Sequence, residues 1–172
     1  MLETYIQAAK ILGTNILRLW CGVKRGKDMT NEERDALLDV CGRAAKVAEA
    51  SGVTLCLECH KKTFTEDPDD AVRLMETVNS PHFRMYWQPN QHRTEEENIA
   101  YAKVIAAYTV NIHVFNWKGK EKYPLAAAKD IWREYISCFD GHKNLLLEFM
   151  PDGKLETLEE EAAALKELVS WK

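Results

Sequence analysis

The sequence predicts an α/β fold in which parallel strands alternate with helices, and three observations support this prediction. Short runs rich in Val, Leu and Ile recur at about 30-residue intervals, the length of one strand–helix unit. The runs are continuous rather than alternating, which is typical of strands that are buried on both faces. Helix-capping patterns lie between them. Three of the runs end in a polar side chain, namely Glu58, His113 and Glu148, and parallel strands end at one common edge of a sheet.

The first half of the sequence predicts three helices and three strands. A helical stripe of apolar residues ends at Gly13, a plausible C-cap. Thr30 and Glu33 form a capping box, in which each side chain can bond the other residue's backbone N–H. Asp67 and Pro68 supply an N-cap and a proline at the first helical position. We therefore predict helices over 3–12, 30–51 and 67–79, and strands over 15–20, 53–58 and 83–87.

The second half continues the same alternation. Thr94 and Glu97 form a second capping box, and Gly141 follows another apolar stripe. Thr157 and Glu160 have the spacing of a third capping box. We predict helices over 94–108, 125–139 and from 157 onward, and strands over 109–113 and 144–148.

We interpret the whole chain, residues 1–172, as a single domain and a partial (β/α)₈ barrel. Each strand is followed by a crossover long enough for a parallel connection. Five strands fall short of the eight that a closed barrel needs. The alternative is a five-stranded open sheet of doubly wound type, but the polar strand ends favour the barrel, whose active sites lie at that edge.

Composition excludes several classes of protein. The chain has 172 residues and a formal net charge of −4, and this mild acidity argues against nucleic acid, whose binding needs a basic face. No apolar stretch approaches the length of a membrane span, and no basic-then-apolar N-terminus suggests a signal peptide. The five cysteines are scattered, which favours reduced thiols and a cytoplasmic location. Cys56 and Cys59 would lie on opposite faces of one strand, which argues against a metal or redox pair.

The strand ends predict a metal centre. Trp20, Glu58, Gln88, His113 and Glu148 occupy the five end positions. Carboxylate, amide and imidazole ligands without thiolate favour Mn²⁺, Mg²⁺ or Co²⁺, with Zn²⁺ as a further candidate. Each residue alone has an ordinary structural explanation, but the recurrence at successive strand ends favours a common site. Two carboxylates beside a metal-bound hydroxycarbonyl can remove a proton from one face of a carbon and return it on the other.

Aromatic and polar residues near the same edge predict a sugar pocket. Aromatic rings stack on the C–H faces of sugars, although ordinary core packing explains some of them equally well. The predicted substrate-binding residues are Trp20, His60, Trp87, Gln91, Trp117 and Lys118.

Four segments together resemble the xylose isomerase-like TIM barrels of the sugar phosphate isomerase/epimerase superfamily. They are residues 8–15, 48–58, 112–115 and 145–149. Their order is similar to the C-terminal portion of that barrel, strands 4–8. Strands 1–3 have no counterpart, so we expect either a truncated chain or open edges that a second copy or another chain covers. Size-exclusion chromatography with light scattering tests this expectation.

The resemblance implies a metal-dependent isomerase or epimerase that acts on a sugar or keto-sugar phosphate. Glu58, His113 and Glu148 match the family's metal ligands, and the two Glu match its acid–base pair. Gln88 stands where the family usually has Asp, which lowers the negative charge of the site by one and weakens cation binding. The alternative is a non-catalytic sugar-binding or regulatory relative that has lost the metal. A third class is the related family of metal-dependent endonucleases. Those enzymes need more His and Asp ligands and a basic groove, and neither is evident in this sequence.

Overall fold

The computed structural model describes residues 2–170, and it confirms an α/β fold with five strands of the predicted parallel type. Contacts divide the chain into two units, with the boundary between Tyr86 and Trp87. The two units are described in turn. No helix within residues 2–170 combines the length and the apolar character needed to cross a bilayer.

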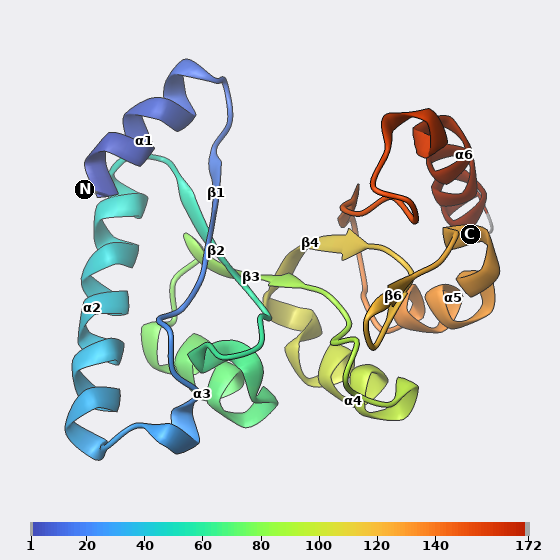
Figure 1. Ribbon diagram of the computed structural model, residues 1–172. Helices are drawn as coiled ribbons and strands as arrows, with labels where there is room; N and C mark the ends of the chain where they lie inside the picture. The colour runs from blue at the N-terminus through green and yellow to red at the C-terminus, as the bar shows by residue number, and fades with distance from the viewer. Residues whose placement is uncertain (1, 171–172) are drawn as a thin grey trace. The chain divides into compact units, whose positions relative to one another are not determined.

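The first unit alternates helices with three parallel strands (Figure 1). Helix α2 is the longest, with 20 residues, and it packs against α3 and β2. The strands have the order β1-β2-β3. The elements are α1 (Leu2–Ile11), β1 (Ile16–Leu19), α2 (Asn31–Ala50), β2 (Thr54–Glu58), α3 (Pro68–Val78) and β3 (Phe83–Trp87), with 3₁₀ turns at Gly26–Asp28 and Phe64–Glu66.

The register of these strands fixes which side chains share a face. Arg18 lies opposite Cys56, and Cys56 lies opposite Arg84 on the next strand. Because side chains alternate along a strand, Glu58 shares the face of Cys56, two residues away. Leu55 and Leu57 belong to the opposite face, and both are buried. The inner strand β2 therefore has an apolar face and a face that carries the polar groups.

The predicted helix starts in this unit are confirmed. The Thr30 side chain accepts a hydrogen bond from the Glu33 N–H, and the Glu33 carboxylate accepts one from the Thr30 N–H. The Asp67 carboxylate accepts a bond from the Asp69 N–H, with Pro68 at the first helical position. These caps satisfy backbone N–H groups that a helix start leaves unbonded, so the local sequence sets both boundaries.

Replacing Gly26 with alanine is expected to destabilise the protein by at most about 1 kcal/mol, the low end of the cost of overpacking, because the obstructing group is the end of a side chain that can turn away. A Cβ atom at Gly26 would lie 1.9 Å from Asp70 Oδ2 and 2.5 Å from Asp70 Cγ, so the Asp70 carboxylate must move. Urea unfolding measures the change. Gly42→Ala is the matched control, because its Cβ meets nothing within 4 Å in helix α2, and we expect it to stabilise by about 0.5–1 kcal/mol. A loss above about 3 kcal/mol in Gly26→Ala would show that the Asp70 carboxylate cannot turn away from this turn.

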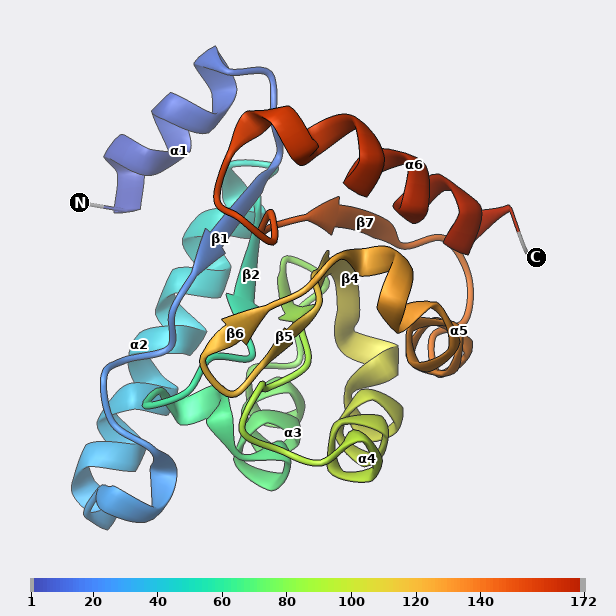
Figure 2. The ribbon, with the colours of Figure 1, turned by 45° about the vertical axis from the view of Figure 1, so that its right-hand side comes forward.

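The second unit combines two parallel strands, a short antiparallel hairpin and three helices (Figure 2). Strands β4 and β7 pair in parallel, and β5 pairs with β6. The elements are α4 (Glu95–Ile105), β4 (Thr109–Val114), β5 (Trp117–Lys118), β6 (Glu121–Lys122), α5 (Lys129–Ser137), β7 (Asn144–Leu147) and α6 (Leu158–Val169), with 3₁₀ turns at Ala106–Tyr108, Leu125–Ala128 and Leu155–Thr157.

An aromatic cluster forms much of this unit's core. The Trp87 ring lies 6.3 Å from that of Trp132, 5.3 Å from that of Tyr135 and 5.3 Å from that of Phe139. The Trp132 indole N–H donates to the Phe115 carbonyl over 2.8 Å, which ties α5 to the end of β4. Burial raises the pKa of Tyr135 to about 12, so its hydroxyl stays neutral in this core.

One predicted helix cap in the second unit needs correction. The Thr157 side chain does not cap α6; its hydroxyl instead lies 2.9 Å from Asp152 Oδ1 and 3.2 Å from the Lys154 carbonyl, two acceptors for its single proton. The β5–β6 hairpin is absent from the predicted elements because two-residue strands carry no detectable periodicity. The second capping box, Thr94 with Glu97, is present as predicted.

Candidate active site

Glu58 ends strand β2 in the first unit and is held by two donors. An ion pair joins Arg18 Nη1 to Glu58 Oε2, and the Trp20 indole N–H donates to the same oxygen over 2.8 Å. The Glu58 side chain is only 3% exposed, whereas that of Arg18 is 46% exposed. A buried carboxylate needs a compensating charge, and Arg18 supplies it here.

Trp20 and His60, two predicted substrate-binding residues, form a stacked pair beside this carboxylate. Their ring centroids are 4.3 Å apart at an interplanar angle of 21°. Trp20 is 55% exposed. His60 Nδ1 lies 2.7 Å from the Lys61 carbonyl, which can only accept, so the proton is on Nδ1 and the neutral ring offers Nε2 as an acceptor. The pair presents a flat aromatic surface with a polar edge, which suits a sugar ring.

Gln88, His113 and Glu148 come together in the second unit. His113 Nδ1 lies 2.8 Å from Gln88 Oε1 and 3.5 Å from Glu148 Oε2. His113 belongs to β4, and Glu148 directly follows the paired strand β7. The Glu148 N–H donates to the Val114 carbonyl over 3.1 Å, which extends the ladder by one residue. The strand pairing thus fixes the backbone on which both side chains stand.

The donor set and its spacing fit a divalent cation. Two ligands that each lie about 2.1 Å from one cation are about 3.0–3.4 Å apart in octahedral or tetrahedral geometry. The two separations from His113 Nδ1 bracket this range. With its proton on Nε2, His113 would offer the Nδ1 lone pair to a bound cation; with the proton on Nδ1, it donates to Gln88 instead. An imidazole, an amide oxygen and a carboxylate form an oxygen-and-nitrogen ligand set.

A pocket of about 200 Å³ lies in the second unit and is lined by Gln91, Trp117 and Lys118. All three are predicted substrate-binding residues, and the structure brings them to one pocket. It borders Pro89 and Asn116, which follow the strand ends that carry Gln88 and His113. The buried Trp117 indole N–H has no hydrogen-bond partner among the described residues, and it is a donor that a ligand can use. Lys118 Nζ is 3.1 Å from Glu95 Oε1.

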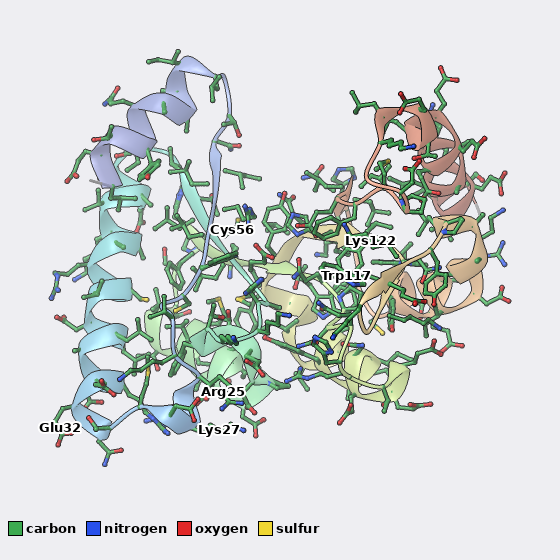
Figure 3. The ribbon with its side chains drawn as sticks, in the orientation of Figure 1. Arg25, Lys27, Glu32, Cys56, Trp117 and Lys122 are labelled. Carbon is green, nitrogen blue, oxygen red and sulfur yellow. The ribbon has the colours of Figure 1, made fainter. Side chains whose placement is uncertain are left out.

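An aromatic group behind this pocket joins the hairpin to the end of β7. The Phe149 ring lies 5.5 Å from that of Phe115 and 5.0 Å from that of Trp117. Lys122 Nζ lies 4.5 Å from the Phe149 ring centroid and 5.2 Å from that of Trp117, and Figure 3 labels Lys122 and Trp117 on the hairpin. Phe149 directly follows Glu148, so this packing also restrains the candidate ligand.

Asn98 fixes the loop that carries Gln88 and Gln91. Its Oδ1 accepts from the Asn90 N–H over 2.8 Å, and its Nδ2 donates to the Asn90 carbonyl over 3.1 Å. Asn98 is itself buried in α4. One side chain thus satisfies both backbone groups of a loop residue, in place of a strand partner.

Replacing Asn98 with alanine is expected to destabilise the protein by about 2–4 kcal/mol, because two backbone groups of Asn90 lose their partners. Urea unfolding measures the loss. Asn98→Asp keeps the acceptor and loses the donor, so we expect an intermediate effect. A loss below about 0.5 kcal/mol, the usual range for surface changes, would show that the loop does not depend on Asn98.

Trp87 and Cys56, two residues singled out in the sequence, both pack in the protein interior. Trp87 is fully buried among the aromatic rings of the second unit, so its placement argues against the predicted contact with substrate. Cys56, labelled in Figure 3, is fully buried, and burial raises the pKa of its thiol to about 12. All five cysteines are free thiols.

Three residues of the site were missed by sequence reasoning. Of the three, Arg18 has the clearest signal in the sequence, since a charged residue interrupts the apolar run from Ile16 to Leu19. Phe149 and Lys122 carry no comparable signal, because their roles depend on the hairpin.

Comparisons with known proteins show which solved structures share this fold. No curated protein matches the chain. Among solved structures, the probable 3-DHS dehydratase AsbF from Bacillus anthracis, which is involved in petrobactin synthesis, matches with a TM-score of 0.80 at 16% identity, over 96% of this chain and 68% of that one. A xylose isomerase-like TIM barrel protein from Mycobacterium smegmatis in complex with magnesium matches with a TM-score of 0.70 at 17% identity, over 98% and 66%.

The D-psicose 3-epimerase from Clostridium cellulolyticum H10, solved with D-tagatose, matches with a TM-score of 0.62 at 13% identity, over 98% of this chain and 68% of that one. The chain therefore spans about two thirds of the length of these structures. At such identities the likeness shows the fold, which is of TIM-barrel type. The family model of the xylose isomerase-like TIM barrel matches residues 1–168, so this chain belongs to the xylose isomerase-like TIM barrel family.

Proposed function

We propose that the chain is a divalent-metal-dependent isomerase or epimerase that acts on a keto-sugar or keto-sugar phosphate. The observation that carries the proposal is the approach of Gln88 and Glu148 to one nitrogen of His113. Membership of the family supports it, as does the fold shared with a D-psicose 3-epimerase. The similar structure in complex with magnesium supports a metal in this fold.

In this proposal the metal ligands are Glu58, Gln88, His113 and Glu148. We include Glu58 in the ligand set because it ends a strand, and the strand ends of a parallel barrel carry the site residues at one face. Its buried carboxylate at the end of β2 suits this role. When bound, a divalent cation polarises a carbonyl and stabilises the negative charge that develops on its oxygen.

The two carboxylates would perform the proton transfer. One takes the proton from the carbon next to the carbonyl, and the electrons of the broken C–H bond form an enediolate. The other returns a proton to the opposite face, which inverts that carbon. Isomerisation would instead require return of the proton to the neighbouring carbon, together with transfer of the hydroxyl proton from one enediolate oxygen to the other. This requires carboxylates on both sides of the carbon, within about 3 Å of the protons that move.

The predicted substrate-binding residues would supply the contacts to the sugar. The stacked pair Trp20 and His60 would pack on the sugar ring, and His60 Nε2 would accept from a hydroxyl. In the 200 Å³ pocket, Gln91 and the Trp117 indole N–H would bind polar groups. Lys118 would contribute a cation for a phosphate, in exchange for its contact with Glu95.

A specific observation favours a second candidate function. Gln88 is neutral where the family usually has Asp, and Glu58 is already paired with Arg18. Both features reduce the attraction for a cation, and a relative that has lost the metal would bind sugars without catalysis.

One experiment separates the two functions. Purified protein with saturating Mn²⁺, Mg²⁺, Co²⁺ or Zn²⁺ is incubated in D₂O with a panel of ketoses, their phosphates and hydroxy-acids. The isomerase or epimerase incorporates deuterium next to the carbonyl, which NMR detects without knowledge of the product. Saturable sugar binding without deuterium incorporation at any metal concentration would favour the non-catalytic relative.

A further inference from the structure

We propose that Arg18 is a built-in counter-cation of Glu58 that weakens the binding of a divalent cation at this carboxylate. The inference rests on the proposed function, because it takes Glu58 as a metal ligand. It adds to that function a residue that sets how much metal the protein needs.

The contacts of Glu58 place the positive charge directly on the candidate ligand. Arg18 Nη1 and Trp20 Nε1 both donate to Oε2, and within the first unit Oε1 has no hydrogen bond or ion pair. The carboxylate is buried and the guanidinium reaches solvent. A cation at Glu58 must therefore either displace Arg18 or bind beside it, and both cost free energy.

The strand register adds a second positive charge to the same face. Arg18 and Arg84 flank Cys56 on the two neighbouring strands, two residues before the level of Glu58. Arg84 is half-buried, and it forms no ion pair with any residue in the range 2–170. This part of the sheet face therefore carries two guanidinium groups and one carboxylate, which gives a local net charge of +1. A cation binds best where the local charge is negative, so this charge opposes its binding.

The charges of the proposed ligands make the effect of Arg18 large. Glu58 and Glu148 are the two anionic members of the set, since Gln88 is an amide. Arg18 offsets one of these two negative charges. Trp20 donates to the same oxygen but carries no net charge. Variants of Arg18 and of Trp20 therefore separate the effect of the Arg18 charge from the effect of positioning Glu58.

The test is the affinity for Mn²⁺, followed by the electron paramagnetic resonance signal of the free ion during titration. Removing a unit charge that close to a divalent cation should tighten binding at least about tenfold in Arg18→Met, even at a water-like dielectric. Arg18→Lys keeps the charge and Trp20→Phe removes only the neutral donor, so both should stay within about threefold of the parent. Arg43→Met removes an exposed charge that pairs with Asp39 in α2 and should leave the affinity unchanged.

Each outcome is informative. Tighter binding in Arg18→Met alone, with a far-UV circular dichroism spectrum that matches the parent, supports the proposal, as does a parent that binds no Mn²⁺ while Arg18→Met does. Equal or weaker binding in Arg18→Met, with a parent that binds, overturns the proposal and leaves the proposed function standing. Equal changes in Arg18→Met and Trp20→Phe also overturn it, in favour of a positioning role. Failure of the parent and of every variant to bind Mn²⁺ overturns both this proposal and the metal-dependent function.

Discussion

Replacing Glu148 with glutamine is expected to lower kcat/KM by about 10³-fold, within the range that general acid–base groups contribute. The substitution keeps the size of the side chain and removes its charge and its capacity to accept a proton. It also makes position 148 resemble Gln88, so the proposed ligand set keeps a single carboxylate, Glu58. Rates of deuterium incorporation measured on the best substrate of the ketose panel give the change.

The controls separate loss of chemistry from loss of metal. Rates are measured across a Mn²⁺ titration, so that a variant with weak affinity still reaches saturation. Glu148→Asp retains the charge but withdraws the carboxylate by one methylene, and we expect it to recover metal binding more than activity. Glu159→Gln removes an exposed carboxylate in the first turn of α6 and should have no effect. Activity within threefold of the parent in Glu148→Gln would remove Glu148 from the proton transfer.

The parts of this structure that sequence reasoning predicted are those that depend on neighbours in the chain. The capping boxes at Thr30 and Thr94 need only a residue three positions away, and both are present. The apolar runs that end at Glu58 and His113 predict buried strands, because continuous burial leaves a pattern in five or six residues. Helix α3 ends at Val78, with Asn79 as a left-handed C-cap, which agrees with the predicted helix end at residue 79.

The parts that were missed depend on residues far apart in the sequence. The Arg18–Glu58 pair joins positions 40 residues apart, and only the strand register brings them to one face. Thr157 has the spacing of a capping box, but Asp152 competes for its hydroxyl, and a spacing rule contains no information about such a competitor. Trp87 is predicted to line the pocket because it is an aromatic residue near the strand-end edge, although the alternation along β3 directs its side chain and that of Gln88 differently.

Replacing Trp87 with alanine is expected to destabilise the protein by about 3–5 kcal/mol, the usual cost of deleting a buried aromatic ring. The indole is fully buried and contacts the rings of Trp132, Tyr135 and Phe139. Its removal leaves a cavity among rigid rings that cannot collapse, so the loss falls at the upper end of that range. Urea unfolding followed by far-UV circular dichroism measures the change, and the stability lost should exceed that of any other variant proposed for this chain.

The smaller variant Trp87→Phe brings two opposing effects into one measurement. The Trp87 indole N–H has no hydrogen-bond partner among the described residues, and an unsatisfied buried donor costs about 1–3 kcal/mol. Phenylalanine removes that cost, while the loss of the second ring costs about 1–2 kcal/mol of packing at about 25 cal/mol per Å². We therefore expect Trp87→Phe to stay within about 1 kcal/mol of the parent, far from the effect of alanine. If Trp87→Phe lost as much stability as Trp87→Ala, the indole N–H would have to contribute a hydrogen bond. The account of Trp87 as an apolar packing residue would then be wrong.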